Sequence, residues 1–181
     1  MKTKDLVFMA MYIALALVLD YVSQMIPILN MPQGGSINLG VIPVLLASYH
    51  LKIKKGIAVA FLWWFVGFVL FGLNRWYLNI PQYLLDYIVP DIVLAFAVLM
   101  PKIKGSNIAT GVIITGFMRF LSTVISGAIF WFPDGETSGS LIAWTGSITY
   151  NLYYNLGTVI VAFFVIYILI KRIPAFKDLI N

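Results

Sequence analysis

The sequence contains no cysteine and a single histidine, His50. Disulfides and thiolate metal sites are therefore excluded, and one histidine cannot build a histidine-rich metal centre. A glycine-rich phosphate loop ending in Lys-Ser or Lys-Thr is also missing, so we expect no ATP hydrolysis by this chain. Charged residues make up 10% of the sequence, whereas a soluble domain has about a quarter. These absences argue against a metalloenzyme, a nucleotide hydrolase and an ordinary soluble domain.

Hydrophobic residues, in contrast, make up 61% of the 181 residues and are gathered into apolar segments. The segments cover residues 5–29, 39–51, 56–73, 81–100, 107–131 and 141–170. Most of them approach or exceed the roughly 20 residues that a membrane-spanning helix needs. The second segment is short and contains Pro43, so alone it could be a partial or tilted span. We predict an all-α integral membrane protein with six transmembrane helices and one domain, residues 1–181.

The net charge of +5 could suggest a nucleic-acid partner, but the basic residues stand in short clusters between apolar segments. The clusters are Lys2 and Lys4; Lys52, Lys54 and Lys55; Lys102 and Lys104; and Lys171, Arg172 and Lys177. In a six-helix topology all of them fall on one side, which the positive-inside rule makes cytoplasmic. We therefore predict a multi-pass protein of the cell membrane with both termini in the cytoplasm, embedded in lipid and without a nucleic-acid partner.

Segment 81–100 carries two carboxylates, Asp86 and Asp91, inside an apolar stretch. An acid at membrane depth is costly and needs a partner, a cavity or a ligand. In a helix Gln82 and Asp86 share one face, and Pro90 deprives the Asp86 carbonyl of its usual donor. The neighbouring rings are Tyr83 and Tyr87. This combination suits a small aromatic or cationic ligand at Asp86, although a kinked helix whose acids pair internally would explain it too; for Asp91 we favour the structural interpretation.

Two polar stripes lie on the last two segments. Arg119, Ser122, Thr123 and Ser126 share one helical face, and Ser147, Asn151 and Asn155 are spaced by four. Most of these side chains fall in the outer half of the membrane, which favours a pocket open to the outside over a full-depth channel. They could also merely bridge helices. Arg119 and Asp91 reach similar depth, so we predict that they form a structural pair.

The first segment offers small residues on its cytoplasmic half. Ala10 and Ala14 are four residues apart, a spacing that allows close approach of another helix. The face formed by these alanines suits either docking of a partner membrane protein or packing within this chain.

Five stretches carry a family resemblance. They are MPQGGS at 31–36, Ile42-Pro43, LLDYIV at 84–89, VISGAIF at 124–130 and SITYN at 147–151. In order and spacing, over nearly the whole chain, they resemble the thiamin-specific substrate-binding subunits, or S-components, of energy-coupling factor (ECF) transporters.

The resemblance implies a six-helix vitamin-binding subunit with a high-affinity pocket near the outer surface. It also implies a transmembrane coupling subunit and two cytoplasmic ATPases as partners, which would use the ATP, and no cofactor in this chain. In the family, small residues on the first helix face the coupling subunit. Here Val7 and Met11 occupy the usual alanine positions, and Ala10 and Ala14 would serve instead.

The resemblance also implies site residues. Asp86 matches the acidic ligand residue, Tyr87 the aromatic after it, and Asn151 the amide of the sixth helix. Trp131 and Trp76 match aromatic positions near the pocket, and Ser147, Thr123 and Gln82 complete our candidate set. Thr123 stands where the family has a histidine, and Gly146 stands where it has a tyrosine.

Because both of these changes remove a ring, vitamin B6 or a thiamin precursor is the alternative to thiamin. Two further alternatives are an intramembrane enzyme using Asp20 and Asp86, whose context matches no catalytic motif, and a scaffold subunit without ligand.

Overall fold

The computed structural model describes residues 2–73, 76–103 and 105–173, and these residues are almost entirely helical. The elements, in chain order, are α1 (Thr3–Met25), η1 (Pro27–Leu29), α2 (Val41–Phe71), α3 (Ile80–Tyr83), η2 (Leu84–Ile88), α4 (Val89–Val93), η3 (Leu94–Leu99), α5 (Ile108–Phe130) and α6 (Leu141–Arg172). Five stretches are long and apolar enough to cross a membrane: Thr3–Met25, Val41–Phe71, Ile80–Leu99, Ile108–Phe130 and Leu141–Arg172. The all-helical membrane fold expected from composition is therefore present.

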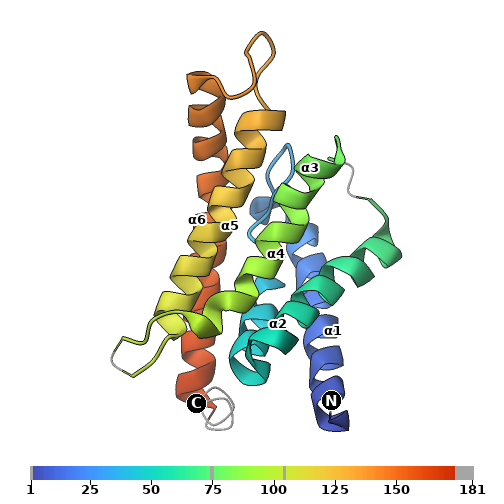
Figure 1. Cartoon of the computed structure of the whole chain (residues 1–181), viewed down its shortest axis with the longest axis vertical. Helices are drawn as coiled ribbons and strands as arrows, with labels where there is room; N and C mark the ends of the chain where they lie inside the picture. Colours follow the sequence, from blue (N-terminus) through green and yellow to red (C-terminus); the bar gives the residue numbers. More distant parts are fainter. Residues whose placement is uncertain (1, 74–75, 104, 174–181) are drawn as a thin grey trace.

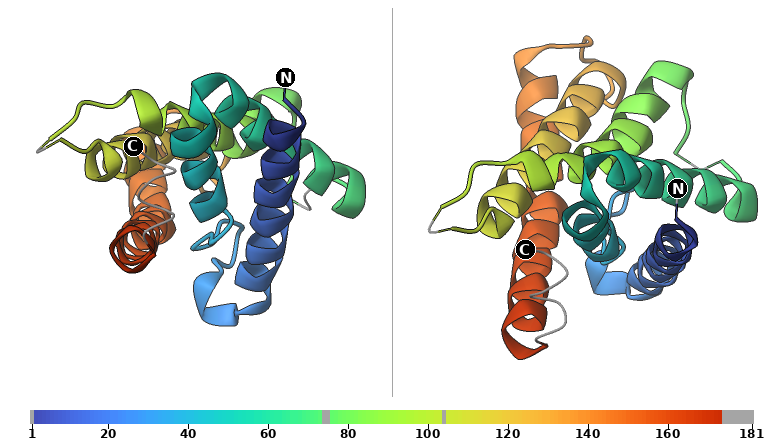
Figure 2. Two further views of the ribbon diagram at one scale, coloured as in Figure 1. Left: turned by 90° about the horizontal axis from the view of Figure 1, so that it is seen from below. Right: turned by 60° about the horizontal axis from the view of Figure 1, so that its bottom comes forward.

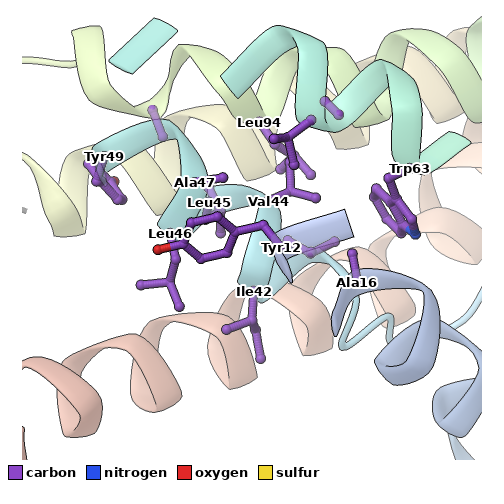
Figure 3. Packing of buried hydrophobic residues seen from close by; sticks show 14 of the residues in the cluster. Tyr12, Ala16, Ile42, Val44, Leu45, Leu46, Ala47, Tyr49, Trp63 and Leu94 are labelled. Carbon is purple, nitrogen blue, oxygen red and sulfur yellow. The ribbon is translucent and has the colours of Figure 1, made fainter. Parts of the chain in front are cut away.

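The first half of α2 forms the centre of the molecule. Residues 41–49 are all buried, because this stretch carries no charge and is apolar on every side. Figure 3 shows its side chains between Tyr12 and Ala16 of α1 and Leu94 of η3. The two hydroxyls of this stretch are both hydrogen-bonded: Ser48 Oγ donates to the Leu45 carbonyl at 2.9 Å, and Tyr49 donates to the carbonyls of Asn107 and Ile108 at 3.3 and 3.1 Å. This packed centre holds the surrounding helices in place.

A break at Lys52 divides α2 into two arms, residues 41–51 and 53–71. Lys52 has φ 66° and ψ 173°, a conformation that residues other than glycine rarely adopt. Figure 1 shows the first arm descending and the second arm leaving obliquely. The predicted connection, residues 52–55, is thus wrong in extent: one residue makes the turn, and residues 53–55 already belong to the second arm.

The stretch Ile80–Leu99, which corresponds to the predicted span at residues 81–100, is irregular. The Asn79 side chain caps its start by accepting from the Gln82 backbone N–H at 2.9 Å. A π-helical turn, Leu84–Ile88, follows, and the stretch ends in 3₁₀ geometry at Leu94–Leu99. Pro90 lacks the N–H that the Asp86 carbonyl would need in an α-helix, which explains why the backbone leaves α-helical geometry ahead of it.

The ends of the helices sort into two groups (Figure 1). The start of α1, the break in α2, the turn before α5 and the end of α6 lie at the lower end of the molecule, and the loop between α5 and α6 lies at the upper end. The connections that carry lysines therefore lie at the same end of the molecule as the start of α1 and the end of α6. The seven-residue loop 30–36 and the start of α3 lie toward the upper end.

Candidate functional site

Asp86 lies in the π-helical turn η2, and its carboxylate accepts a hydrogen bond from Gln82. Gln82 is fully buried; its Nε2 donates to Asp86 Oδ2 at 2.6 Å, and its Oε1 accepts from the Leu78 backbone N–H at 3.0 Å. The predicted shared face of Gln82 and Asp86 is therefore present. Since both ends of the Gln82 amide are used, its contribution is to orient the carboxylate.

Two indole rings lie beside the carboxylate. Trp131, which follows α5, donates from Nε1 to Asp86 Oδ2 at 3.3 Å. The Trp131 and Trp76 rings meet edge to face, with centroids 6.1 Å apart. The Tyr83 and Tyr87 rings are tilted against each other at 35°, with centroids 4.6 Å apart. The structure thus gathers Asp86 with three of the predicted aromatic residues, which come from three separate parts of the chain.

The charge of Asp86 has no cationic partner within the residues that the structure describes. Its hydrogen-bond partners are the neutral side chains of Gln82 and Trp131. Ser126 on α5, fully buried, has a hydroxyl without a hydrogen-bond partner among those residues, and it lies close enough to Asp86 to interact with it. A carboxylate surrounded by neutral donors and aromatic rings can accept a cationic or N–H-bearing group.

The polar stripe of α6 faces α5. Ser147 Oγ donates to the Val124 carbonyl at 2.8 Å, and Asn151 Nδ2 donates to the Ser147 carbonyl at 2.9 Å. Asn151 Oδ1 accepts from the Tyr154 hydroxyl. A side chain at Gly127 would collide with Ser147, so this glycine permits the close approach of the two helices.

One turn deeper, Asn155 Nδ2 donates to Thr123 Oγ1 at 3.2 Å, and Asn155 Oδ1 is buried without a partner in the described part of the chain. Thr123 therefore already interacts with α6. Gly146, the other departure from the family pattern, faces open space and borders a hollow of about 590 Å³. The remaining lining residues of this hollow are Met31, Thr145, Thr149 and Tyr150.

Loop 30–36 is fastened to α6 by Tyr150. The Tyr150 hydroxyl accepts from the Gln33 backbone N–H and donates to the Gly34 carbonyl, both at 2.9 Å. Gly34 and Gly35 have φ of 93° and 86°. A Cβ on them would lie 2.9 Å from the Trp76 ring and 2.7 Å from the Tyr154 ring, so the loop backbone lies directly on these aromatic side chains.

The predicted pair of Asp91 and Arg119 is present. Arg119 Nη1 lies 2.9 Å from Asp91 Oδ1, and only 11% and 13% of the two side chains are exposed. Asp20 on α1 accepts from Asn38 Nδ2 at 2.8 Å, and the Asn38 backbone N–H donates to Thr158 Oγ1 at 3.0 Å. The ion pair joins α4 to α5, and the hydrogen bonds of Asn38 join α1 to α6.

Ala10 and Ala14 are exposed on α1, so they do not pack within this chain. The large side chains around them are also exposed: Val7, Met11, Leu15 and Val18. Docking of a partner at this face stays a prediction.

Sequence reasoning passed over several residues that the structure brings to the site. The sequence analysis assigned no role to Tyr150 or Tyr154, and it did not predict the hydrogen bond between Asn38 and Asp20. The spacing of Tyr150 and Tyr154, four residues apart beside Asn151, was the available signal.

Three comparisons with known proteins bear on this site. The sequence model of the thiamine transporter protein family matches residues 6–178. The thiamine transporter ThiT of Bacillus subtilis is 32% identical over 187 aligned positions, which cover 93% of this chain and 91% of that protein. The solved structure of ThiT from Listeria monocytogenes superposes with a TM-score of 0.73 over 95% of this chain and 96% of that one; its sequence is 23% identical, so this likeness speaks for the fold.

Proposed function

Since this chain belongs to the thiamine transporter protein family, we propose that it is the thiamin-binding S-component of an uptake transporter in the cell membrane. It is a transport protein and not an enzyme, which removes the intramembrane enzyme from the alternatives. The matches named above are thiamine proteins, and none of them concerns vitamin B6.

The observation that carries the proposal is the environment of Asp86. Thiamin joins a pyrimidine bearing an amine to a thiazolium cation, so it offers both N–H donors and a positive charge. Asp86, oriented by Gln82 and lacking a cation of its own in the described residues, is complementary to either group. Trp76, Trp131 and Tyr87 supply ring faces for stacking and for a cation–π contact.

Asn151 completes the proposed site from α6. Its side-chain oxygen is bound by Tyr154, and its nitrogen by Ser147, so the amide has a fixed orientation. Because Thr123 and Gly146 stand where the family has a histidine and a tyrosine, this site lacks those two rings. The hollow of about 590 Å³ beside Gly146 is lined by none of the residues Asp86, Trp76, Trp131, Tyr87 and Asn151.

Transport needs the partners that the family resemblance implies. We propose that the two arms of α2 count as separate helices, giving six in all, with the lysine-rich end of the molecule and both termini in the cytoplasm. The exposed face around Ala10 and Ala14 would dock a transmembrane coupling subunit. Two cytoplasmic ATPases would hydrolyse the ATP.

Calorimetry on the purified chain in detergent, without ATP, tests the proposal. We expect thiamin to bind with submicromolar affinity and the Asp86→Asn variant to bind at least a hundredfold more weakly. Asp134→Asn, which removes an exposed acid from the loop before α6, is the matched control and should bind as the unmodified chain does.

Titrations with pyridoxine and with the isolated pyrimidine precursor distinguish the alternative ligands. Tighter binding of either one than of thiamin would overturn the assignment of thiamin. Binding of none of the three would favour a scaffold subunit.

A further inference from the structure

A groove lies at the lysine-rich end of the molecule, and none of its lining residues belongs to the proposed thiamin site. It has a volume of about 980 Å³ and runs between α1 and the second arm of α2. Its lining residues are Lys2, Asp5, Leu6, Met9, Lys54, Lys55, Ala58 and Leu62. Figure 2 (right) shows the start of α1 beside this arm.

The charge of the groove is positive and partly uncompensated. Lys55 Nζ lies 2.8 Å from Asp5 Oδ2, and this ion pair joins the two helices across the groove. Lys2 and Lys54 form no ion pair with any described residue, and both are exposed. Two ammonium groups are therefore available to an anion.

Both walls change from charged to apolar in the same direction. On α1, Lys2 and Asp5 are followed one turn later by Leu6 and Met9. On α2, Lys54 and Lys55 are followed by Ala58 and Leu62. α1 and the second arm of α2 both start at the lower end of the molecule and lead away from it (Figure 1), so the groove is cationic at this end and apolar farther along the two helices.

We propose that this groove binds an anionic phospholipid, with the phosphate between Lys2 and Lys54 and an acyl chain along the apolar wall. A free anion would contact only the cationic end of the groove, whereas a lipid would contact both the cationic end and the apolar walls. Basic pockets between helices are suited to anionic lipid headgroups. The volume is within the range of small-molecule sites, about 300–1,000 Å³. The groove adjoins the face of Ala10 on α1, because its lining residue Leu6 lies four residues before Ala10.

Native mass spectrometry of the purified full chain tests the proposal. Phosphatidylglycerol and phosphatidylcholine with identical acyl chains are titrated against the unmodified chain, against K2Q/K54Q and against K102Q/K171Q. The last variant also removes two positive charges, but outside the groove. We expect phosphatidylglycerol to bind at least tenfold more weakly to K2Q/K54Q and within twofold to K102Q/K171Q, with phosphatidylcholine weaker throughout.

A second variant leaves every charge in place. Ala58→Trp fills the apolar wall and should also weaken phosphatidylglycerol at least tenfold, while thiamin binding, as the check on folding, is unchanged. Four outcomes would each overturn the proposal. The first two are equal weakening of phosphatidylglycerol binding by the two lysine variants and equal binding of the two lipids. The others are unchanged lipid binding to Ala58→Trp and displacement of the lipid by glycerol phosphate at a similar concentration.

Discussion

Asp86 and Asp91 lie five residues apart in one apolar stretch, yet their surroundings differ. Asp91 is paired with Arg119 at 2.9 Å. Among the described residues, Asp86 accepts hydrogen bonds from the neutral donors of Gln82 and Trp131. A carboxylate whose charge is balanced inside the protein contributes to the structure, whereas one oriented by neutral donors keeps its charge for an incoming group. Asp86 and Asp91 therefore differ in the hydrogen-bond partners of their carboxylates more than in their depth in the membrane.

The largest effect is expected when the balanced acid loses its cation. Arg119→Met should lower the free energy of unfolding by about 3–5 kcal/mol, because it leaves Asp91 buried and unpaired. Thermal unfolding in detergent measures this change. The double variant R119M/D91L should recover most of the loss, and a stable R119M that has lost only thiamin binding would contradict a structural pair.

Removal of the unbalanced acid should affect binding and spare the fold. Asp86→Asn keeps the shape and loses the charge, so we expect thiamin to bind at least a hundredfold more weakly, about 2.7 kcal/mol. The melting temperature should stay the same or rise, because Asp86 forms no ion pair with any residue that the structure describes. A fall in melting temperature as large as that of R119M would erase the distinction between the two acids.

A smaller effect is expected from the indole that orients Asp86. Trp131→Phe keeps a ring beside Trp76 and removes the N–H that donates to Asp86 at 3.3 Å. One neutral donor to a charged acceptor corresponds to about 1.5 kcal/mol, so thiamin binding should weaken roughly tenfold. Calorimetry measures the affinity; Trp144→Phe on α6 serves as the control and should leave it unchanged.

The smallest effect concerns the backbone, far from either acid. Lys52→Gly should raise the melting temperature by a few degrees, because glycine relieves about 1 kcal/mol or more of strain at φ 66°. Lys54→Gly makes the same substitution in a regular part of α2 and should lower the melting temperature. Equal shifts for the two variants would mean that the bend at Lys52 carries no strain.

The sequence predicted well what depends on sums over many residues. Hydrophobicity over about 20 residues revealed the spans, and the spacing of four placed Gln82 on the face of Asp86. Comparable depth in the membrane was enough to pair Arg119 with Asp91.

What the sequence could not reveal depends on single dihedral angles and on distant contacts. The break at Lys52 occupies one residue, and the irregular course of Ile80–Leu99 is set by the hydrogen-bond register around Pro90. The fastening of loop 30–36 to Tyr150 joins residues 117 positions apart, so no local pattern announces it.

The π-helical turn at Leu84–Ile88 sets the direction of the Asp86 side chain relative to that of Asp91. Such a turn behaves as one extra residue inserted into a helix, and each residue advances an α-helix by about 100°. Deleting one residue of this turn on the C-terminal side of Asp86 would restore regular winding and rotate Gln82 and Asp86 by about that angle relative to Asp91. A length change of one amino acid would then redirect the ligand-facing carboxylate while leaving the composition of the segment almost untouched.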